Sequence, residues 1–183
     1  SPKQYKVAVF GLGFVGLTLS LIMASKGYKV IGIENNEEII KKLKLKKHTF
    51  YEKDIDKYIN NFYDKNFHIQ KNFKNINANV YIISVGTPVN KLKKTNFSNL
   101  KKVSKIIAKN INKQDLIILR STVEIGTTRN IVVPIIEKSS KLIAGKDFNI
   151  AFCPERTIEG NALNELQHLP QLIGGYTESC YLA

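Results

Sequence analysis

A glycine-rich segment from Gly11 to Gly16 most strongly constrains the fold, because it joins an apolar run at 6–10 to a stretch at 15–26 whose apolar residues recur at helical spacing. A strand that turns into a helix through G-x-G-x-x-G is typical of a dinucleotide-binding unit. Gly11 permits the tight turn, Gly13 lets the backbone approach a pyrophosphate, and Gly16 lets the helix pack closely on the strand. The free N–H groups of the helix start would then face an anion.

A carboxylate at Glu34 adds context to this motif, since glycine triplets also occur in ordinary turns. Glu34 follows a second apolar run at 29–33 and lies 23 positions after Gly11. A carboxylate at this place accepts hydrogen bonds from the adenosine ribose and repels a 2′-phosphate, so it favours NAD over NADP. The alternative interpretation of Glu34 is a solvated strand end.

The composition is that of an ordinary globular domain. The chain has 183 residues, 43% hydrophobic and 23% charged, enough for one sizeable core. No apolar run reaches the roughly 18 residues of a membrane span, and the start of the chain lacks the pattern of a signal peptide, so we expect a cytoplasmic protein with no membrane partner. Cys153 and Cys180 are too few for a disulfide framework and lack metal-ligand spacing, which favours reduced thiols.

The net charge of +13 is unevenly distributed. Residues 1–113 carry 22 Lys and Arg against 7 Asp and Glu, whereas residues 114–183 carry 6 against 8. The excess is almost entirely lysine in a segment rich in Asn and Ile, which indicates compositional drift. Base-reading modules would add arginines, an aromatic stacking set or a helix-turn-helix pattern, so we expect no specific nucleic-acid partner.

Strand and helix patterns alternate along the rest of the chain. Apolar runs of strand length recur at 79–85, 116–120 and 148–152. Helical patterns lie between the strands, at 36–47, from about 54 within the aromatic-rich stretch 48–67, at 99–110 and at 126–142. Asn35 or Asn36 is placed to cap the first helix, Pro134 kinks or splits the last, and the polar stretch 91–98 is expected to be a mobile loop. The alternation predicts an α/β domain of the Rossmann type, a doubly wound, mainly parallel sheet with helices on both faces.

Polar residues follow three of the expected strands, at the edge where a doubly wound sheet binds its ligands. Thr87 follows the strand at 79–85, although a plain turn residue before Pro88 is an equal interpretation. Thr122 follows the next strand. Glu155 follows the last and is suited to acid–base chemistry if partial burial raises its pKa, the alternative being a cap for a helix that begins near Asn161.

Four motifs in order resemble the UDP-glucose/GDP-mannose dehydrogenase family, in particular the branch that acts on UDP-N-acetyl-hexosamines such as UDP-N-acetyl-D-mannosamine. They are Gly-Leu-Gly-Phe-Val-Gly at 11–16, Val-Gly-Thr-Pro at 85–88, Arg-Ser-Thr-Val at 120–123, and Cys-Pro-Glu-Arg from 153 with Glu-Gly and a later Gly-Gly, up to 175. The resemblance covers essentially the whole chain. It implies oxidation of a sugar C6 hydroxyl to a carboxylate with two NAD, through a cysteine-bound thiohemiacetal and thioester.

The resemblance also implies roles for single residues. The positions that match cofactor contacts are Phe14, Val15, Glu34, Thr87 and Thr122. Thr122 further matches a threonine that helps to position water, and Glu155 matches the general base proposed for thioester hydrolysis. Glu155, Arg156 and Glu159 belong to the segment that lines the sugar nucleotide, and Arg156 fits the acetamido-sugar branch, since the glucose branch usually has phenylalanine there. Cys153 does not match the reactive cysteine.

The chain also departs from the family pattern. The nucleophilic cysteine and its assisting lysine, asparagine and aspartate belong downstream of residue 183, so we expect residues 1–175 to form the NAD-binding domain and 176–183 to start a connecting helix. Such a fragment would bind NAD without turnover and be monomeric, whereas full-length relatives usually pair as homodimers through the central helix. Ile39 stands where the family often has a basic residue, which leaves the adenosine contact open.

Two alternatives compete with this interpretation. One is a non-catalytic Rossmann module that senses NAD. The other is an NAD-dependent dehydrogenase of the β-hydroxyacid type, which shares the glycine loop but should lack the Pro154-Glu155 loop that this chain has.

Overall fold

The computed structural model describes residues 4–71, 73, 75–91 and 93–183, and its framework is one seven-stranded sheet. The strands run in the order β3-β2-β1-β4-β5-β6-β7. Their bounds are β1 Lys6–Phe10, β2 Lys29–Ile33, β3 Phe67–Gln70, β4 Val80–Ile83, β5 Leu116–Leu119, β6 Asn149–Phe152 and β7 Gly174–Gly175. Every neighbouring pair is parallel except β6 with β7. The order reverses between β1 and β4, so the predicted doubly wound Rossmann-type fold is confirmed.

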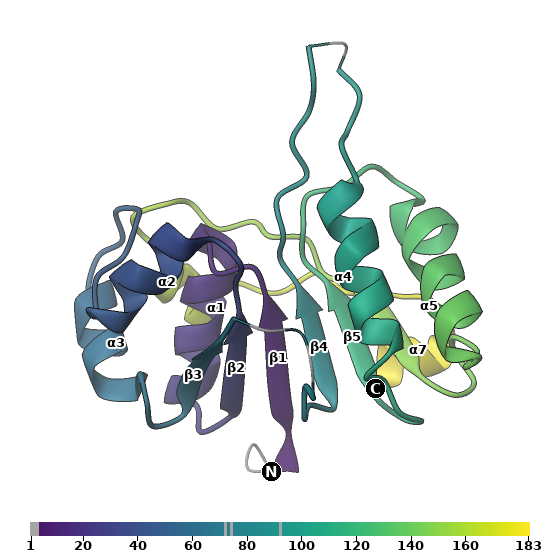
Figure 1. Ribbon diagram of the computed structural model, residues 1–183, viewed down its shortest axis with the longest axis horizontal. Coiled ribbons are helices and arrows are strands. Elements are labelled where there is room, and N and C mark those ends of the chain that lie inside the picture. The colour runs from purple at the N-terminus through teal and green to yellow at the C-terminus, as the bar shows by residue number, and fades with distance from the viewer. Residues whose placement is uncertain (1–3, 72, 74, 92) are drawn as a thin grey trace.

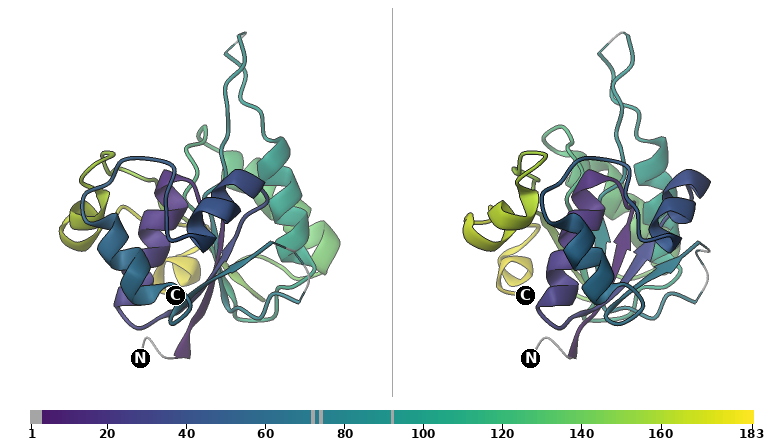
Figure 2. Two further views of the ribbon diagram at one scale, coloured as in Figure 1. Left: turned by 60° about the vertical axis from the view of Figure 1, so that its left-hand side comes forward. Right: turned by 90° about the vertical axis from the view of Figure 1, so that its left-hand side faces the viewer.

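Helices cover both faces of this sheet (Figures 1 and 2). One face packs against α1 Phe14–Ser25, α2 Glu37–Lys44, α3 Ile55–Phe62 and α6 Ala162–His168. The other packs against α4 Ser98–Ala108 and α5 Val133–Ser140, while α7 Glu178–Leu182 lies beside β6 and β7. Among the described residues, no helix is both long and apolar enough to cross a membrane.

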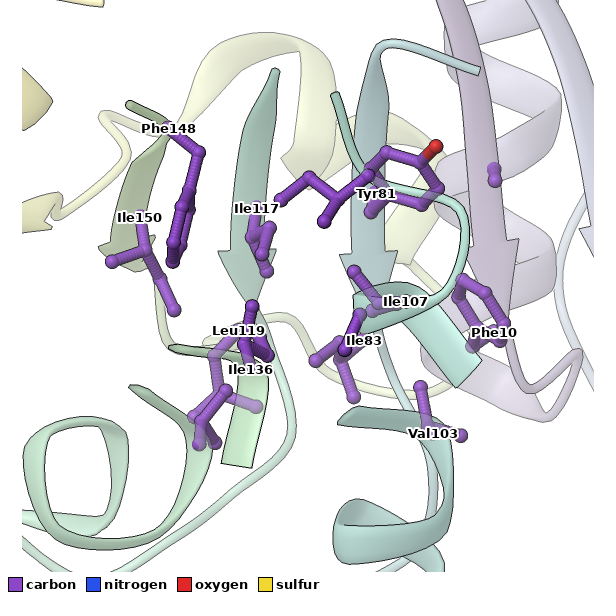
Figure 3. Close-up of a cluster of buried hydrophobic side chains, with 14 of the residues drawn as sticks. Phe10, Tyr81, Ile83, Val103, Ile107, Ile117, Leu119, Ile136, Phe148 and Ile150 are labelled. Atoms are coloured by element: carbon purple, nitrogen blue, oxygen red, sulfur yellow. The ribbon is translucent and has the colours of Figure 1, made fainter. Parts of the chain in front are cut away.

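The strands are apolar throughout because successive side chains point to opposite faces, and both faces are covered. In β1, Val7 and Val9 belong to the cluster with α1, whereas Ala8 and Phe10 belong to the cluster with α4. Figure 3 shows this second cluster, in which side chains from β4, β5 and β6 meet those of α4 and α5. The buried Tyr81 hydroxyl in this cluster donates to the backbone carbonyls of Ala78 and Asn110.

The structure contains two strands, β3 and β7, that the sequence analysis did not predict. β3 is a four-residue edge strand that pairs with β2, and β7 is a Gly-Gly pair, which has no side chains and so no apolar pattern. The expected helix at 126–142 divides into a π-helical segment, Thr128–Val132, and α5, and Pro134, which has no N–H to donate, lies where the two segments join. Asn36 caps α2, since its side chain accepts the N–H groups of Glu38 and Ile39.

A long two-armed loop projects from the carboxyl edge of the sheet between β4 and α4 (Figure 1). A bridge joins its arms at Val89 and Thr95, and the Thr95 hydroxyl donates to the Glu124 carboxylate at 2.5 Å. This loop includes the stretch expected to be mobile at 91–98, of which residue 92 lies outside the described residues.

Replacing Gly16 with alanine is expected to destabilise the fold by about 3 kcal/mol or more, because the new Cβ would lie 1.8 Å from the Gly11 carbonyl oxygen and 2.5 Å from Ser84 Oγ. Urea unfolding followed by circular dichroism measures the loss. Gly13→Ala is the matched control, since a Cβ there meets nothing within 4 Å. Equal stability of the two variants would contradict the assigned role of Gly16 in helix–strand packing.

Candidate functional site

The glycine loop lies at the carboxyl end of β1 and presents the start of α1 to solvent. Gly11 has φ of +88°, in the region that favours glycine, and its N–H donates to the Ile33 carbonyl at 2.9 Å. Beyond Gly13 the first amides of α1, from Phe14 and Val15, have no acceptor within the helix. The open space at Gly13 therefore lies in front of unpaired N–H groups, which suits a phosphate.

Glu34 is buried at the end of β2 and bonded to this loop, so it is not a solvated strand end. Its Oε2 accepts the Leu12 N–H at 2.7 Å, and its Oε1 accepts those of Asn35 and Asn36 at 2.8 and 2.9 Å. Two carboxylate oxygens offer about four lone-pair sites, so acceptor capacity for a ribose hydroxyl remains.

A cavity of about 300 Å³ opens beside Glu34, where the order of the sheet reverses. Its rim comes from the ends of three strands, with Gly11 after β1, Glu34 after β2 and Val85 after β4. Its apolar walls are formed by Ile39, Phe73, Val103 and Ile106, and its polar lining includes Asn36, Asn99 and Lys102. Apolar walls with a few polar groups suit an aromatic base, and the Glu34 carboxylate in the same lining suits a ribose hydroxyl.

Sequence reasoning missed part of this cavity. Ile39, at the position where the family often has a basic residue, contributes apolar surface to the cavity. The basic side chain of Lys102 on α4 also lines the cavity, and its Nζ lies 5.4 Å from the centroid of the Phe73 ring. Phe73 lies in an irregular segment with no periodic pattern, so local sequence carried no signal for it. The helical spacing of α4 did mark Val103 and Ile106 as inward-facing residues.

The residues predicted after β4 and β5 lie together. Thr87 Oγ1 donates to the Thr122 carbonyl at 2.6 Å, and Ser121 Oγ donates to the Val85 carbonyl at 2.7 Å. Ser84 Oγ continues the series and donates to the Phe10 carbonyl at 2.9 Å. Thr87 therefore does more than precede a proline turn, because it joins two strand ends at the ligand edge.

Glu155 is held by a buried ion pair that the sequence did not reveal. Arg120 Nη2 donates to Glu155 Oε2 at 2.6 Å, and the two side chains are 5% and 7% exposed. Burial alone would raise the pKa of Glu155, but the hydrogen bond and charge of Arg120 outweigh it and hold the pKa below the ordinary value of 4.5. The condition set for acid–base chemistry, a pKa raised by partial burial, is therefore not met in this structure.

Glu155 does not cap α6 either, because its Oε1 accepts the N–H groups of Arg156 and Thr157, both at 2.8 Å. The carboxylate at the start of α6 is Glu52, whose oxygens accept the N–H groups of Gly160 at 2.9 Å and Leu163 at 3.0 Å. Glu52 is buried and lies more than 100 positions earlier in the chain, so no sequence spacing identified it.

Both cysteines are free thiols, as expected. Cys153 is buried next to Arg120, at 3.2 Å from Sγ to Nη1, and burial raises the pKa of its thiol more than the guanidinium lowers it. A protonated, buried thiol is a poor nucleophile, which agrees with the assignment of Cys153 to the loop instead of to covalent chemistry. Between Cys153 and Gly160 the side chains of Arg156 and Glu159 are exposed.

Comparison with protein families identifies this chain at residues 5–183 with the NAD-binding domain of the UDP-glucose/GDP-mannose dehydrogenase family. It is 33% identical over 182 residues to a UDP-N-acetyl-D-mannosamine dehydrogenase of Campylobacter jejuni, covering 96% of this chain and 44% of that protein. It is also 33% identical over 172 residues to protein CapL of Staphylococcus aureus, covering 93% of this chain and 39% of the relative. The chain thus spans about two fifths of these relatives.

Comparison with solved structures also finds nucleotide-sugar dehydrogenases. The UDP-N-acetyl-D-mannosamine dehydrogenase of Pyrococcus horikoshii superposes with a TM-score of 0.90 at 30% identity, over 96% of this chain and 42% of that one. A GDP-mannose dehydrogenase of Pseudomonas aeruginosa gives 0.88 at 26% identity, with the same coverage. A 3-hydroxyisobutyrate dehydrogenase of Salmonella typhimurium gives 0.58 at 12% identity, a likeness of fold alone.

The ion pair at Glu155 predicts a pH-dependent stability. Because folding lowers the pKa of this carboxyl, its stabilisation is present above the ordinary value of 4.5 and is lost as the pH falls through the lower folded value. Glu155→Gln, which leaves Arg120 unpaired, should cost about 3–5 kcal/mol at neutral pH and less in acid. Urea unfolding of both proteins at several pH values measures the difference. The exposed Glu178→Gln should show no such trend, and a pH-independent loss in Glu155→Gln would refute the ion pair.

Proposed function

The chain belongs to the UDP-glucose/GDP-mannose dehydrogenase family as its NAD-binding domain, and we propose that it serves a nucleotide-sugar 6-dehydrogenase that oxidises the C6 hydroxyl of a UDP-N-acetyl-hexosamine, or of UDP-glucose, to a carboxylate. The observation that carries this proposal is the cavity at the β1–β4 reversal, with open space at Gly13 and the buried Glu34 at its mouth. NAD, when bound, accepts the hydride in each of the two oxidation steps.

We assign cofactor binding to residues at the carboxyl ends of β1, β2, β4 and β5. Gly11, Gly13 and Gly16 form the loop, and the amides of Phe14 and Val15 face the pyrophosphate. Glu34 receives the adenosine ribose, and the cavity beside it receives adenine. Thr87 and Thr122 meet the cofactor farther along the same edge, and Thr122 also helps to position water; the hydrogen bond from the Thr87 hydroxyl to the Thr122 carbonyl supports this placement.

The substrate side is assigned to the loop after β6. Glu155, Arg156 and Glu159 contact the sugar nucleotide, and Glu155 accepts a proton from the water that hydrolyses the thioester. Its lowered pKa keeps it ionised, the form that an acceptor needs, but makes it a weak base while it is paired with Arg120. The cysteine that carries the thioester is proposed to lie in a region that follows residue 183 in the full-length enzyme.

We further propose the domain organisation, the pathway, the location and the oligomeric state of the enzyme. Residues 1–175 are the NAD-binding domain and 176–183, which contain α7, begin the connecting helix. The names of the relatives favour the acetamido-sugar branch and, with it, synthesis of a surface polysaccharide. We expect a cytoplasmic enzyme with no specific nucleic-acid partner, a homodimer at full length, with the 183-residue chain monomeric.

The 183-residue chain should bind NAD at least about tenfold more tightly than NADP, because a 2′-phosphate would face the Glu34 carboxylate. Gly13→Val should weaken NAD binding by at least about tenfold with unchanged unfolding, since its side chain would fill only the ligand's space. Titration calorimetry measures both. Gly174→Val, on β7 away from the cofactor cavity, is the control. Equal affinity for NADP would remove Glu34 from the ribose site.

In the full-length enzyme, tested on a panel of UDP-sugars by NADH formation, Cys153→Ser should keep most turnover because its thiol is buried and protonated. Glu155→Gln should block the second half-reaction, because the amide cannot accept a proton from water, and a thioester should accumulate on a downstream cysteine. Mass spectrometry of quenched enzyme locates the acyl group. An acyl group on Cys153, with activity lost in Cys153→Ser, would overturn both assignments.

A further inference from the structure

The candidate substrate loop, residues 153–160, is held at both ends by buried charged side chains from distant parts of the chain. Arg120 holds its start through Glu155, and Glu52 holds its end through Gly160. Between the two anchors Arg156 and Glu159 are exposed. A loop that is fixed at its ends and exposed at its centre is suited to present side chains to a ligand without first becoming ordered.

The backbone of Arg120, the residue that holds the start of the loop, is hydrogen-bonded to the neighbouring strand. The backbone N–H groups of Arg120 and Ser121 both donate to the Ile83 carbonyl, at 2.8 and 3.1 Å, which fixes the end of β5 on β4. The residue that follows, Thr122, belongs to the cofactor edge. Arg120 therefore links the strand end that carries Thr122 to the loop that carries Glu155.

The planar guanidinium of Arg120 donates hydrogen bonds to three side chains. Nη2 donates to Glu155, and Nη1 donates to Cys153 Sγ at 3.2 Å and to Gln171 Oε1 at 3.1 Å. The Arg120 side chain is 5% exposed, so the guanidinium itself is shielded from water. A lysine ammonium is a point charge on a flexible stem and lacks the planar geometry to reproduce this set.

The second anchor acts on backbone amides. Glu52 is 4% exposed, and its carboxylate bridges the Gly160 N–H at the loop end and the Leu163 N–H in the first turn of α6. A parallel bridge between Glu52 and Gly160 adds backbone pairing at the same point. The segment before α3 thus fixes where the loop ends and the helix begins.

We propose that Arg120 and Glu52 are positioning residues of the substrate loop, which together orient Glu155, Arg156 and Glu159 toward the sugar nucleotide. The inference rests on the proposed function for the identity of the ligand, whereas the two anchors rest on the contacts alone. Neither residue touches the reacting atoms in this scheme. Their effect is specific to the sugar side, since the cofactor cavity includes neither Arg120 nor Glu52.

The anchoring is tested first in the 183-residue chain, by amide hydrogen exchange measured with NMR. Arg120→Lys should speed exchange at Arg156 and Thr157 by at least about tenfold, and Glu52→Gln should do so at Gly160 or Leu163. The Leu12 amide, held by Glu34, should be unchanged in both. Glu137→Gln is the matched control, because Glu137 also accepts a backbone N–H, that of Ala144 at 3.0 Å, away from the loop.

The positioning role is then tested by kinetics of the full-length enzyme. Arg120→Lys and Glu52→Gln should lower kcat/KM for the UDP-sugar by about 10- to 100-fold and change the KM for NAD by less than about twofold. Arg120→Met should lower it further, with Arg120→Lys giving partial rescue. Arg129→Lys, at an exposed arginine on the π-helical segment, is the control.

The outcomes separate the inference from the function on which it rests. Unchanged exchange at the loop amides, or equal losses for NAD and the UDP-sugar, would overturn the positioning role. If Arg120→Met fails to fold, Arg120→Lys and Glu52→Gln still decide the question. If the unmodified enzyme oxidises no UDP-sugar, the proposed function fails, while the exchange experiment still decides whether the anchors hold the loop.

Discussion

The carboxyl edge of the sheet depends on one constraint, that backbone groups left unpaired where parallel strands end must find other partners. Here short side chains from neighbouring strand ends supply them. Ser84 donates to the Gly11 carbonyl, Ser121 to that of Val85, and Thr87 to that of Thr122. These bonds run sideways from β1 to β5 and keep the strand ends in register. Three neighbouring strand ends are therefore tied together by side chains of the protein itself.

Two buried carboxylates at this edge differ in their partners, and this difference separates their roles. Glu34 accepts three backbone N–H groups and, among the residues that the structure describes, forms no ion pair, so its charge is spread over the loop that it stabilises and remains available to a ribose. Glu155 is bonded to a guanidinium as well as to two amides, so its charge is neutralised locally. In the proposed function the first recognises the ribose, and the second accepts a proton while Arg120 keeps it ionised.

Much of the fold was predictable because the signals are local. The apolar runs marked β1, β2, β4, β5 and β6, and the helical spacing marked α1 to α5 within a few residues. β3 and β7 were not, since an edge strand of four residues and a Gly-Gly pair acquire strand geometry only from β2 and β6. The sequence left open whether Pro134 kinks or splits the helix, and the structure places the division between Val132 and Val133.

The sequence by itself determined the fold class and the ligand edge, because the spacing of the glycines, of Glu34 and of the polar residues after each strand is a property of the chain. Only the tertiary structure decided which charges meet. Arg120 was read as part of a motif and Glu52 not at all, yet both lie buried against the loop at 153–160, from positions 35 and 108 residues away. Electrostatic partnership depends on distance in space and on exclusion of water, and neither is written in local sequence.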